Sequence, residues 1–274
     1  MKTWFITGAS RGFGALIVDA VLASGDSVVA TARDPSSLAN HPRLLKLSLD
    51  VTNEAQAREA AASAIARFGR IDVLVNNAGY GLLGAVEEAS AVEVERVYAT
   101  NVFGLLNVTR AVLPYMRKQR SGHIINMSSI GGYASSSGWG VYCSTKFAVE
   151  GISEALSIEL APLGIHATVV EPGYFRTDFL SAQSLSSTAV RIDDYADTVG
   201  RMRTFAAAAN HQQPGDPQRL AKVIVQLAAE NTPPTRLALG SDTVARIEEK
   251  NRDVQRELEL WRSVSISTDF VAAA

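Results

Sequence analysis

The sequence is poor in the residues that build metal sites and disulfides. Its 274 residues include one cysteine, Cys143, so neither an internal disulfide nor a cage of cysteine ligands can form. The four histidines are scattered along the chain and give a metal site no support. Because no paired base stands beside Cys143, we interpret it as a small buried thiol rather than a nucleophile. We therefore expect no metal.

The sequence also lacks a strong excess of charge of either sign and any long apolar run. Lys and Arg total 26 against 28 Asp and Glu, a formal net charge of -2, and no basic run of the kind that follows a phosphate backbone is present. No apolar run approaches the roughly 18 residues that span a bilayer. The opening MKTWFITGAS leads straight into structured sequence without a cleavable signal. We expect a cytoplasmic protein that binds neither nucleic acid nor membrane.

What the chain does contain is a regular alternation of apolar runs with Ala-rich helical segments. Continuous runs of β-branched and aliphatic residues are typical of strands buried on both faces. Such runs occur at residues 3–7, 27–31, 44–49, 71–75, 123–127, 166–170 and 235–239. Helical spacing lies between them, as at 54–68 and 92–116. The alternation predicts an α/β fold, a doubly wound parallel sheet of seven strands with helices on both faces.

The length suits one α/β domain with an ample core, and we expect that domain to cover residues 1–240. Residues 179–217 break the rhythm of strands and helices, and they are rich in Ser, Ala, Asp and Gln. We interpret residues 179–213 as an insertion that forms a lid over the substrate, because long insertions in compact domains are usually functional. Residues 242–261 form a charged amphipathic helix. We expect this C-terminal extension, residues 241–274, to pack on the same domain.

A glycine-rich turn, TGASRGFG at residues 7–14, directly follows the first predicted strand. Glycines there permit a tight turn and let the backbone approach a pyrophosphate, while the following helix aims its N–H groups at the anion. The spacing G-x-x-x-G-x-G departs from the general G-x-G-x-x-G dinucleotide fingerprint. Glycines in a β-α loop can also be turn chemistry alone, so the turn by itself leaves both interpretations open.

This spacing resembles that of the short-chain dehydrogenase/reductase family in its typical short form, and further motifs extend the resemblance over residues 3–240. Residues 76–79, NNAG, follow the fourth predicted strand like the family motif that stabilises the sheet beside the cofactor. Residues 50–51 are similar to the segment that binds the adenine ring, and Pro172-Gly173 with Thr177 to the loop that holds the nicotinamide. The resemblance implies a Rossmann-type fold and a bound nicotinamide cofactor. The cofactor-binding residues implied are Gly8, Ser10, Arg11, Gly12, Phe13, Gly14, Arg33, Asp50, Val51, Asn77, Ala78, Gly79, Tyr142, Lys146, Pro172, Gly173 and Thr177.

Tyr142 and Lys146 lie four positions apart on a predicted helix, so their side chains share one face. An exposed helical face is the ordinary interpretation of such a pair. Ser129, in NMSSIGG at the end of the fifth predicted strand, resembles the family's catalytic serine; Ser128 competes, but strand alternation and the family spacing favour Ser129. Asn101 resembles the asparagine that completes the family's tetrad and holds a water beside the lysine. Together these four residues predict a proton-transfer site.

The chemistry of this site can be argued from the side chains. A free phenol has a pKa near 10, and a nearby ammonium and an oxidised nicotinamide both favour its phenolate. Lys146 therefore tunes Tyr142. In reduction Tyr142 gives its proton to the carbonyl oxygen, and in oxidation it removes the proton of the alcohol. Ser129 donates a hydrogen bond to the same oxygen as charge develops there.

A mainly apolar wall is predicted beside the site, which suits hydrophobic ketones or secondary alcohols. Its members are Tyr80, Tyr133, Trp139, Tyr174, Phe175 and Phe179, with Leu82 and Phe205 as further candidates. The C-terminal half resembles the branch of the family that contains hydroxysteroid dehydrogenases and bacterial carbonyl reductases. The resemblance implies a homodimer or homotetramer, and the missing Asp-Gly-Gly ending of many tetrameric relatives counts against the tetramer.

NADP(H) is the expected cofactor, with NAD(H) as the alternative. The second strand ends near Thr31, so Ala32 occupies the position where related NAD enzymes carry an acid. Arg33 and Arg11 supply positive charge for a 2'-phosphate. Asp34 lies at the spacing of the NAD acid but precedes a proline and is expected to point outward. Two solvated arginines are the competing interpretation.

Two other functions stay open. A non-catalytic dinucleotide sensor can use the same fold, since fold alone does not fix function. Sensors usually lack the Tyr/Lys pair that this chain has. An epimerase or dehydratase of the extended branch shares that pair but usually has a larger substrate domain and a different glycine turn.

Overall fold

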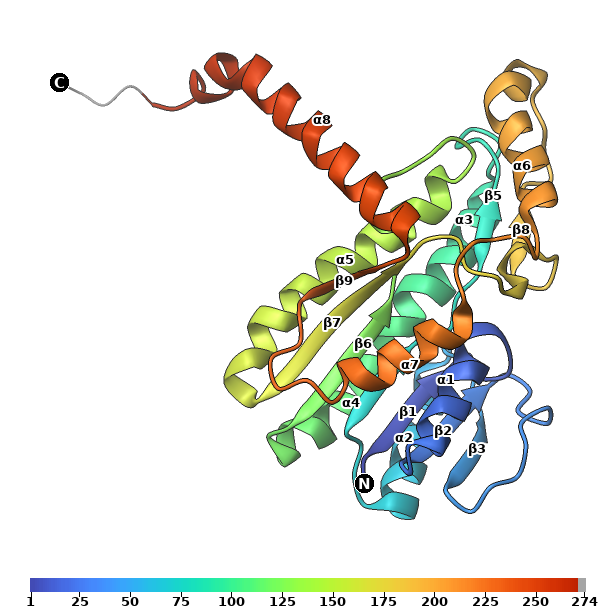
Figure 1. Ribbon diagram of the computed structural model, residues 1–274, viewed down its shortest axis with the longest axis vertical. Helices are drawn as coiled ribbons and strands as arrows, with labels where there is room; N and C mark the ends of the chain where they lie inside the picture. Colours follow the sequence, from blue (N-terminus) through green and yellow to red (C-terminus); the bar gives the residue numbers. More distant parts are fainter. Residues whose placement is uncertain (271–274) are drawn as a thin grey trace.

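Seven parallel strands form one sheet with helices on both faces (Figure 1). The computed structural model describes residues 1–270, and the strand order is β3-β2-β1-β4-β6-β7-β9. The strands are Thr3–Thr7 (β1), Ser27–Ala32 (β2), Leu44–Ser48 (β3), Val73–Asn76 (β4), Gly122–Met127 (β6), Ile165–Pro172 (β7) and Arg236–Leu239 (β9). The helices are Gly12–Ala23 (α1), Glu54–Phe68 (α2), Ala91–Tyr98 (α3), Leu105–Gln119 (α4), Gly140–Leu160 (α5), Arg201–Ala209 (α6), Pro217–Leu227 (α7) and Ser241–Ile266 (α8). The predicted doubly wound fold is confirmed.

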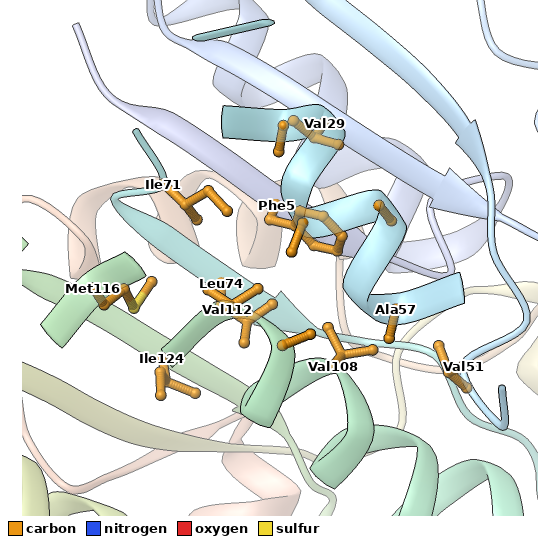
Figure 2. Close-up of a cluster of buried hydrophobic side chains, with 14 of the residues drawn as sticks. Phe5, Val29, Val51, Ala57, Ile71, Leu74, Val108, Val112, Met116 and Ile124 are labelled. Carbon is orange, nitrogen blue, oxygen red and sulfur yellow. The ribbon is translucent and has the colours of Figure 1, made fainter. Parts of the chain in front are cut away.

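Alternation along the central strands divides the core between the two faces of the sheet. Trp4 and Ile6 of β1 pack with side chains of α1 and α7, whereas Phe5 packs with those of α2 and α4. All three are buried. Figure 2 shows Phe5 beside Leu74 of β4 and Val112 of α4. Because side chains of successive strand residues point to opposite faces, a strand covered on both sides must be apolar throughout.

The order of the strands creates a crevice at the carboxyl ends of β1 and β4. From β1 the chain runs outward through β2 and β3, then returns to the other side of β1 for β4 and β6. Open α/β sheets bind ligands where the strand order reverses in this way. The glycine turn connects β1 to α1 at this point, so the fold places the turn at the mouth of the crevice.

The helix predicted over residues 92–116 is interrupted. A capping box of Ser90 and Glu93 starts α3, but Ala99–Gly104 form a π-helical turn before α4 begins. Single π-helical turns inside helices often mark functional sites. Asn101 lies in this turn, and its side-chain amide is bonded to both the N–H and the C=O of Tyr80. The wider turn therefore holds Asn101 against the segment that follows β4, which helical periodicity could not predict.

Residues 179–213 are ordered and contain a strand of their own. Leu185–Ser187 (β8) pair in parallel with Gly81–Leu83 (β5) in a second, two-stranded sheet. The segment continues through a π-helical turn at Ala196–Gly200 into α6. Buried Glu88 fastens it, since its carboxylate accepts a hydrogen bond from Ile192 N at 2.9 Å and pairs with Arg203. The insertion is thus attached to the body at both β5 and Glu88.

The C-terminal helix differs from the expectation that it packs on the domain. Only the first turns of α8 contact the body: Thr243 is buried, and Tyr133 donates a hydrogen bond to Asn251. Beyond these residues α8 projects away from the sheet (Figure 1), with Leu260 at 73% and Trp261 at 63% exposure. The amphipathic pattern predicted the helix but could not identify what its apolar face contacts. Residues 271–274 of the expected tail lie outside the described residues.

Within residues 1–270 no helix combines the length and the apolarity that crossing a membrane requires. The same residues contain no group of three or more His, Cys, Asp and Glu side chains that could hold a metal ion.

Candidate active site

A cavity of about 900 Å³ opens at the carboxyl ends of the strands. It brings together most of the residues that the sequence analysis selected. Those lining it are Gly8, Ser10, Arg11, Gly12, Phe13, Arg33, Asp50, Val51, Asn77, Ala78, Gly79, Tyr80, Ser129, Trp139, Tyr142, Lys146, Pro172, Gly173, Tyr174, Phe175, Thr177 and Phe179. Five selected residues do not line it, namely Gly14, Leu82, Asn101, Tyr133 and Phe205. A cavity of this size at a strand-order reversal is the usual place for a cofactor with its substrate.

The glycine turn is shaped to receive an anion. Gly8 and Gly12 have φ of +63° and +54°, a region that favours glycine. A side chain on Gly14 would overlap the carbonyl oxygen of Gly8, so the turn can pack this closely only with glycine at position 14. At the start of α1, Arg11 caps no backbone N–H with its side chain, and the first turn carries no acidic residue. The free N–H groups and the positive helix terminus therefore face the cavity, as binding of a diphosphate requires.

The NNAG segment fixes this turn to the sheet. Asn77 donates from its side chain to the carbonyl oxygens of Thr7 at 3.0 Å and Gly8 at 3.1 Å. The side-chain amide of Asn76, the last residue of β4, donates hydrogen bonds to Thr109 of α4 and to Asn126 of β6, at 2.9 Å each. Asn77 thus holds the glycine turn, and Asn76 holds the NNAG segment to the sheet. The residues present fit a dinucleotide, because the turn that would bind its diphosphate is fixed in place.

The corner beside β2 carries two arginines and one acid. β2 ends at Ala32, and Arg33 follows it into the cavity wall. Within residues 1–270 Arg33 takes part in no ion pair, whereas Arg11 donates to Gln183 O at 2.6 Å. Asp34 also reaches the cavity, and hydrogen bonds from Ser36 lower the pKa of its carboxyl. The end of β2 thus carries both basic and acidic side chains, so its geometry alone does not decide between NADP(H) and NAD(H).

Tyr142 and Lys146 project from α5 into the innermost part of the cavity. Each is only 7% exposed, and the Nζ atom of Lys146 lies 5.7 Å from the centroid of the Tyr142 ring. Lys146 donates to Met127 O at 2.8 Å, which anchors it to the end of β6. Ser129 lies beside the Tyr142 ring across Gly131, where a Cβ would be 3.5 Å from Ser129 Oγ and 3.7 Å from Tyr142 Cε1, and it accepts from Gly131 N at 3.1 Å. Ser129, Tyr142 and Lys146 therefore meet at one point.

Ser128 is directed away from this point. Both serines line the cavity, but the Ser128 hydroxyl lies over Gly132 beside Glu150, not beside Tyr142. Successive residues at the end of a strand alternate in direction, which is why only one of the two can face the phenol. The preference for Ser129 over Ser128 agrees with this arrangement.

Burial shifts the pKa values of Tyr142 and Lys146 in opposite directions. It raises the pKa of the Tyr142 hydroxyl above its ordinary value, with Cys143 and Tyr174 adding to the effect and the Ser129 hydrogen bond opposing it. Burial lowers the pKa of Lys146 to about 8, against the opposing charge of Glu150. Low-dielectric surroundings disfavour whichever form is charged. At neutral pH Tyr142 thus holds the proton that an acid catalyst would give.

Asn101 lies behind the cavity wall. It is 2% exposed, and its amide donates to Tyr80 O at 2.9 Å and to Thr145 Oγ1 at 3.1 Å. Gly79 separates it from Lys146: a Cβ on that glycine would be 3.1 Å from Asn101 Oδ1 and 3.8 Å from Lys146 Nζ. Asn101 is therefore a neighbour of the lysine, and its role in holding a water stays a prediction.

The substrate end of the cavity has an aromatic wall. Trp139 lies 5.7 Å from Tyr142 and 6.4 Å from Phe179, measured between ring centroids, and Tyr142 lies 5.6 Å from Phe179. Phe175 packs instead on Phe13 at 5.5 Å, next to the glycine turn. Tyr174 lines the cavity and contacts Phe205 from behind. This wall leaves an apolar space in front of the Tyr142 hydroxyl.

Tyr133 is not brought to the cavity. Its hydroxyl donates to Asn251 of α8, because the short helical turn after Ser129 directs the ring outward. Leu82 is buried under the wall, and Phe205 is 49% exposed outside it. Cys143 is a buried thiol, as predicted, and burial raises its pKa.

Sequence reasoning missed a polar residue in the cavity. Gln213 is 3% exposed and lines the cavity, yet neither atom of its amide has a partner among the described residues. Its backbone carbonyl accepts from the guanidinium of Arg176 at 3.2 Å. A buried amide without partners costs free energy, so a ligand or water is expected to satisfy it. Its position just before the PGDP turn was the only signal in the sequence.

Comparisons with known proteins agree with this geometry. A family model described as short chain dehydrogenase matches residues 2–187. The chain is 38% identical over 273 residues to oxidoreductase BOA17 of Botryotinia fuckeliana, covering 97% of this chain and 99% of that one. It is 42% identical to a 3-ketodihydrosphingosine reductase of Bacteroides thetaiotaomicron, covering 86% of each.

Solved structures show the same similarity. A short-chain dehydrogenase from Streptomyces avermitilis superposes with a TM-score of 0.92 at 41% identity, covering 98% of this chain and 99% of that one. A serine dehydrogenase complexed with NADP+ gives a TM-score of 0.73 at 29% identity, covering 86% and 94%. A short-chain dehydrogenase/reductase from Burkholderia phymatum in complex with NAD gives 0.82 at 25% identity, covering 93% and 95%. Proteins of this fold thus bind either cofactor.

Proposed function

Because the chain belongs to the short-chain dehydrogenase/reductase family and is an NAD(P)-dependent oxidoreductase, we propose that it interconverts a hydrophobic ketone and a secondary alcohol with NADP(H). The observation that supports this most is the buried meeting point of Ser129, Tyr142 and Lys146 beneath an apolar wall. The reaction would be that of a carbonyl reductase or alcohol dehydrogenase.

The protein's own residues account for the proton in this reaction. The nicotinamide cofactor, when bound, supplies or accepts the hydride. Tyr142, kept protonated by burial, gives its proton to the carbonyl oxygen of the substrate. Ser129 donates a hydrogen bond to the same oxygen and stabilises its developing charge. Lys146 holds positive charge beside the phenol, which lowers the cost of the phenolate that remains.

The preference for NADP(H) rests on the corner beside β2. Ala32 leaves no acid at the end of the strand, and the guanidinium of Arg33 has no carboxylate partner within residues 1–270. A phosphate on the ribose would give that guanidinium a charge-assisted hydrogen bond. Asp34 is engaged with Ser36 N at 2.9 Å, which reduces its availability to a ribose hydroxyl.

A substrate with a long apolar chain suits the wall formed by Trp139 and Phe179. The relative of 42% identity is named a 3-ketodihydrosphingosine reductase, so a long-chain ketone of that kind belongs in the first panel to be tested. Simple aliphatic, aromatic and steroid ketones complete the panel. The assay follows the absorbance of the reduced nicotinamide with NADPH and with NADH, and Tyr142→Phe protein is the control.

The outcomes of this panel separate the candidate functions. NADPH consumption that needs both the ketone and Tyr142 supports the proposal. Cofactor binding without turnover of any ketone or alcohol supports the non-catalytic sensor. Conversion of a sugar-like substrate without net change in the reduced nicotinamide supports the epimerase or dehydratase. Consumption that persists undiminished in Tyr142→Phe contradicts the assigned mechanism.

We also propose a homo-oligomer. Phe103 on the π-helical turn is 56% exposed, and Phe147 and Ile158 on α5 are 46% and 69% exposed. Exposed apolar side chains of this size on neighbouring helices often mark a contact between subunits. Light scattering coupled to gel filtration measures the mass, and a monomer would contradict the proposal. The cytoplasmic location stays a prediction from the sequence.

A further inference from the structure

A pair of buried carboxyl groups lies behind Lys146, on the side away from the cavity. Glu150 follows Lys146 by one turn on the same face of α5. Glu171 is in β7, directly before Pro172 of the cavity wall. The two residues are 6% and 1% exposed, and a carboxylate oxygen of each lies within 4 Å of the same nitrogen, Nε of Arg236. Two buried carboxyl groups close together cannot both be ionised cheaply, because each disfavours the charge of the other.

The positive charge near this pair is insufficient for full ionisation. Arg236 of β9 lies 3.3 Å from Glu150 and 3.8 Å from Glu171, measured from Nε to carboxylate oxygen. The same guanidinium is shared with Glu154 at 2.6 Å. With Lys146 one turn away on α5, two cations thus face three carboxyl groups, two of which are buried. A proton retained by the pair would reduce the excess of negative charge.

Two buried oxygens of the pair lack hydrogen-bond donors among the described residues. Oε1 of Glu150 and Oε1 of Glu171 lack partners among residues 1–270, as does the buried hydroxyl of Ser128. The Ser128 hydroxyl and Glu150 Oε1 converge on the space over Gly132, where a Cβ would lie 2.9 Å from Glu150. Ionised carboxylates only accept hydrogen bonds, so a proton kept by the pair would supply one of the missing donors. Burial and Glu150 raise the pKa of Glu171 to about 7.

We propose that Glu150 and Glu171 share one proton at neutral pH and that the charge of this pair sets the proton affinity of Lys146. The two glutamates are positioning residues, since they touch neither substrate nor cofactor but act through the lysine. For its catalytic readout the proposal rests on the proposed carbonyl reduction. The charged groups that face the pair are Lys146 and Glu154 on α5 and Arg236 on β9.

The consequence concerns the alkaline side of the activity profile. Burial lowers the pKa of Lys146 to about 8, while the charge of Glu150 raises it. As pH rises through neutrality the pair loses its shared proton and carries a second negative charge. This charge supports the ammonium at the pH where burial would otherwise neutralise it. The pair thus extends the pH range over which Lys146 can tune Tyr142.

Two substitutions test the coupling against a matched control. Glu150→Gln removes the charge one turn from Lys146, so the alkaline fall of kcat should move to lower pH by on the order of one unit. Glu171→Gln leaves Glu150 ionised but prevents the second charge, so it should move the fall in the same direction by less. Glu154→Gln alters a 55% exposed partner of the same Arg236 and should leave the profile in place. The dissociation constant for NADPH should stay near the wild-type value in all three.

A second readout needs no turnover. In the wild-type protein, infrared difference spectra should show a protonated carboxyl band that disappears as pH rises through neutrality. Either glutamine variant should lose the band, and NMR of the Lys146 side chain should report a lower ammonium pKa in Glu150→Gln. If the band titrates but the protein reduces no ketone, the shared proton of Glu150 and Glu171 is supported and the proposed function is rejected. Absence of a band that titrates near neutral pH, or a Lys146 pKa unchanged in folded Glu150→Gln, would overturn the inference.

Discussion

The ammonium nitrogen of Lys146 lies 5.7 Å from the centroid of the Tyr142 ring, one helical turn away on α5. Both side chains are buried, yet burial raises the pKa of the phenol and lowers that of the ammonium to about 8. The shifts separate their roles. Tyr142 keeps its proton through the neutral range, whereas Lys146 titrates close to it and can govern the pH dependence of activity.

Replacing Lys146 by Met should lower kcat and flatten the alkaline limb of the profile. In reduction the charged ammonium is the useful form, and since its pKa is about 8, wild-type activity should fall as pH rises through that value. The variant has no ammonium to lose, so its residual activity should not show this fall. The measurement is kcat for ketone reduction across neutral and alkaline pH. A fall at the wild-type pH in Lys146→Met would assign the titration to another group.

Replacing Arg33 by Asp should weaken NADPH binding far more than NADH binding. Arg33 stands directly after β2 and lines the cavity, where we propose that it binds a 2'-phosphate. A charge-assisted hydrogen bond is worth about 1.5 to 3 kcal/mol, so its loss should lower relative affinity for NADPH by about 10- to 100-fold. Titration calorimetry with both cofactors measures this ratio. Equal effects on the two cofactors, or equal kcat/KM with both in the wild-type protein, would contradict the proposed preference.

Residues 179–213 should become protected from hydrogen exchange when ligand binds. Phe179, Leu180 and Gln183 line the cavity, whereas the amide of Ile192 is already bonded to buried Glu88. We therefore expect NADPH with a substrate analogue to protect residues 179–187 most, with Ile192 as the internal reference. Mass spectrometry of exchanged peptides reads both. The same protection with and without ligand would mean that the insertion is a fixed wall rather than a lid.

Gly14→Ala should damage the turn that receives the cofactor. The added methyl would overlap Gly8 O and lie 2.7 Å from the Asn77 side chain, so the turn must shift. Overpacking of this kind typically costs about 1 to 3 kcal/mol of unfolding free energy. Cofactor affinity should fall with it. Gly151→Ala on the exposed face of α5 meets nothing within 4 Å and is the matched control, expected to raise stability by about 0.5 to 1 kcal/mol. Equal denaturation midpoints for the two variants would contradict the account of the turn.

Much of the fold was predictable because the spacing of apolar residues along the sequence shows which side chains of a helix or strand are buried. The apolar run at residues 3–7 is β1, and the Ala-rich segment at 54–68 is α2. The same signal says nothing about partners. It predicted the helix at 242–261 but not that α8 would leave the body after its first turns.

The candidate site divides in the same way. Tyr142, Lys146 and Ser129 were found because their spacing on a helix and at a strand end is local in sequence. Tyr133 was placed in the wall wrongly, since its direction depends on a short helical turn and on Asn251 far along the chain. Arg236 of β9 brings Glu150 of α5 together with Glu171 of β7, so no local pattern could predict this cluster.

The measurement that tests the central claim most directly compares Tyr142→Phe with the wild-type protein in single-turnover reduction of a ketone by NADPH. The substitution removes only the hydroxyl, and the ring keeps its contacts with Trp139 and Phe179. We predict normal folding and a near-normal dissociation constant for NADPH, with a rate of hydride transfer reduced by about 10²- to 10⁴-fold, the usual contribution of a general acid. A rate above about a tenth of the wild-type value at equal cofactor occupancy would show that Tyr142 is not the proton donor.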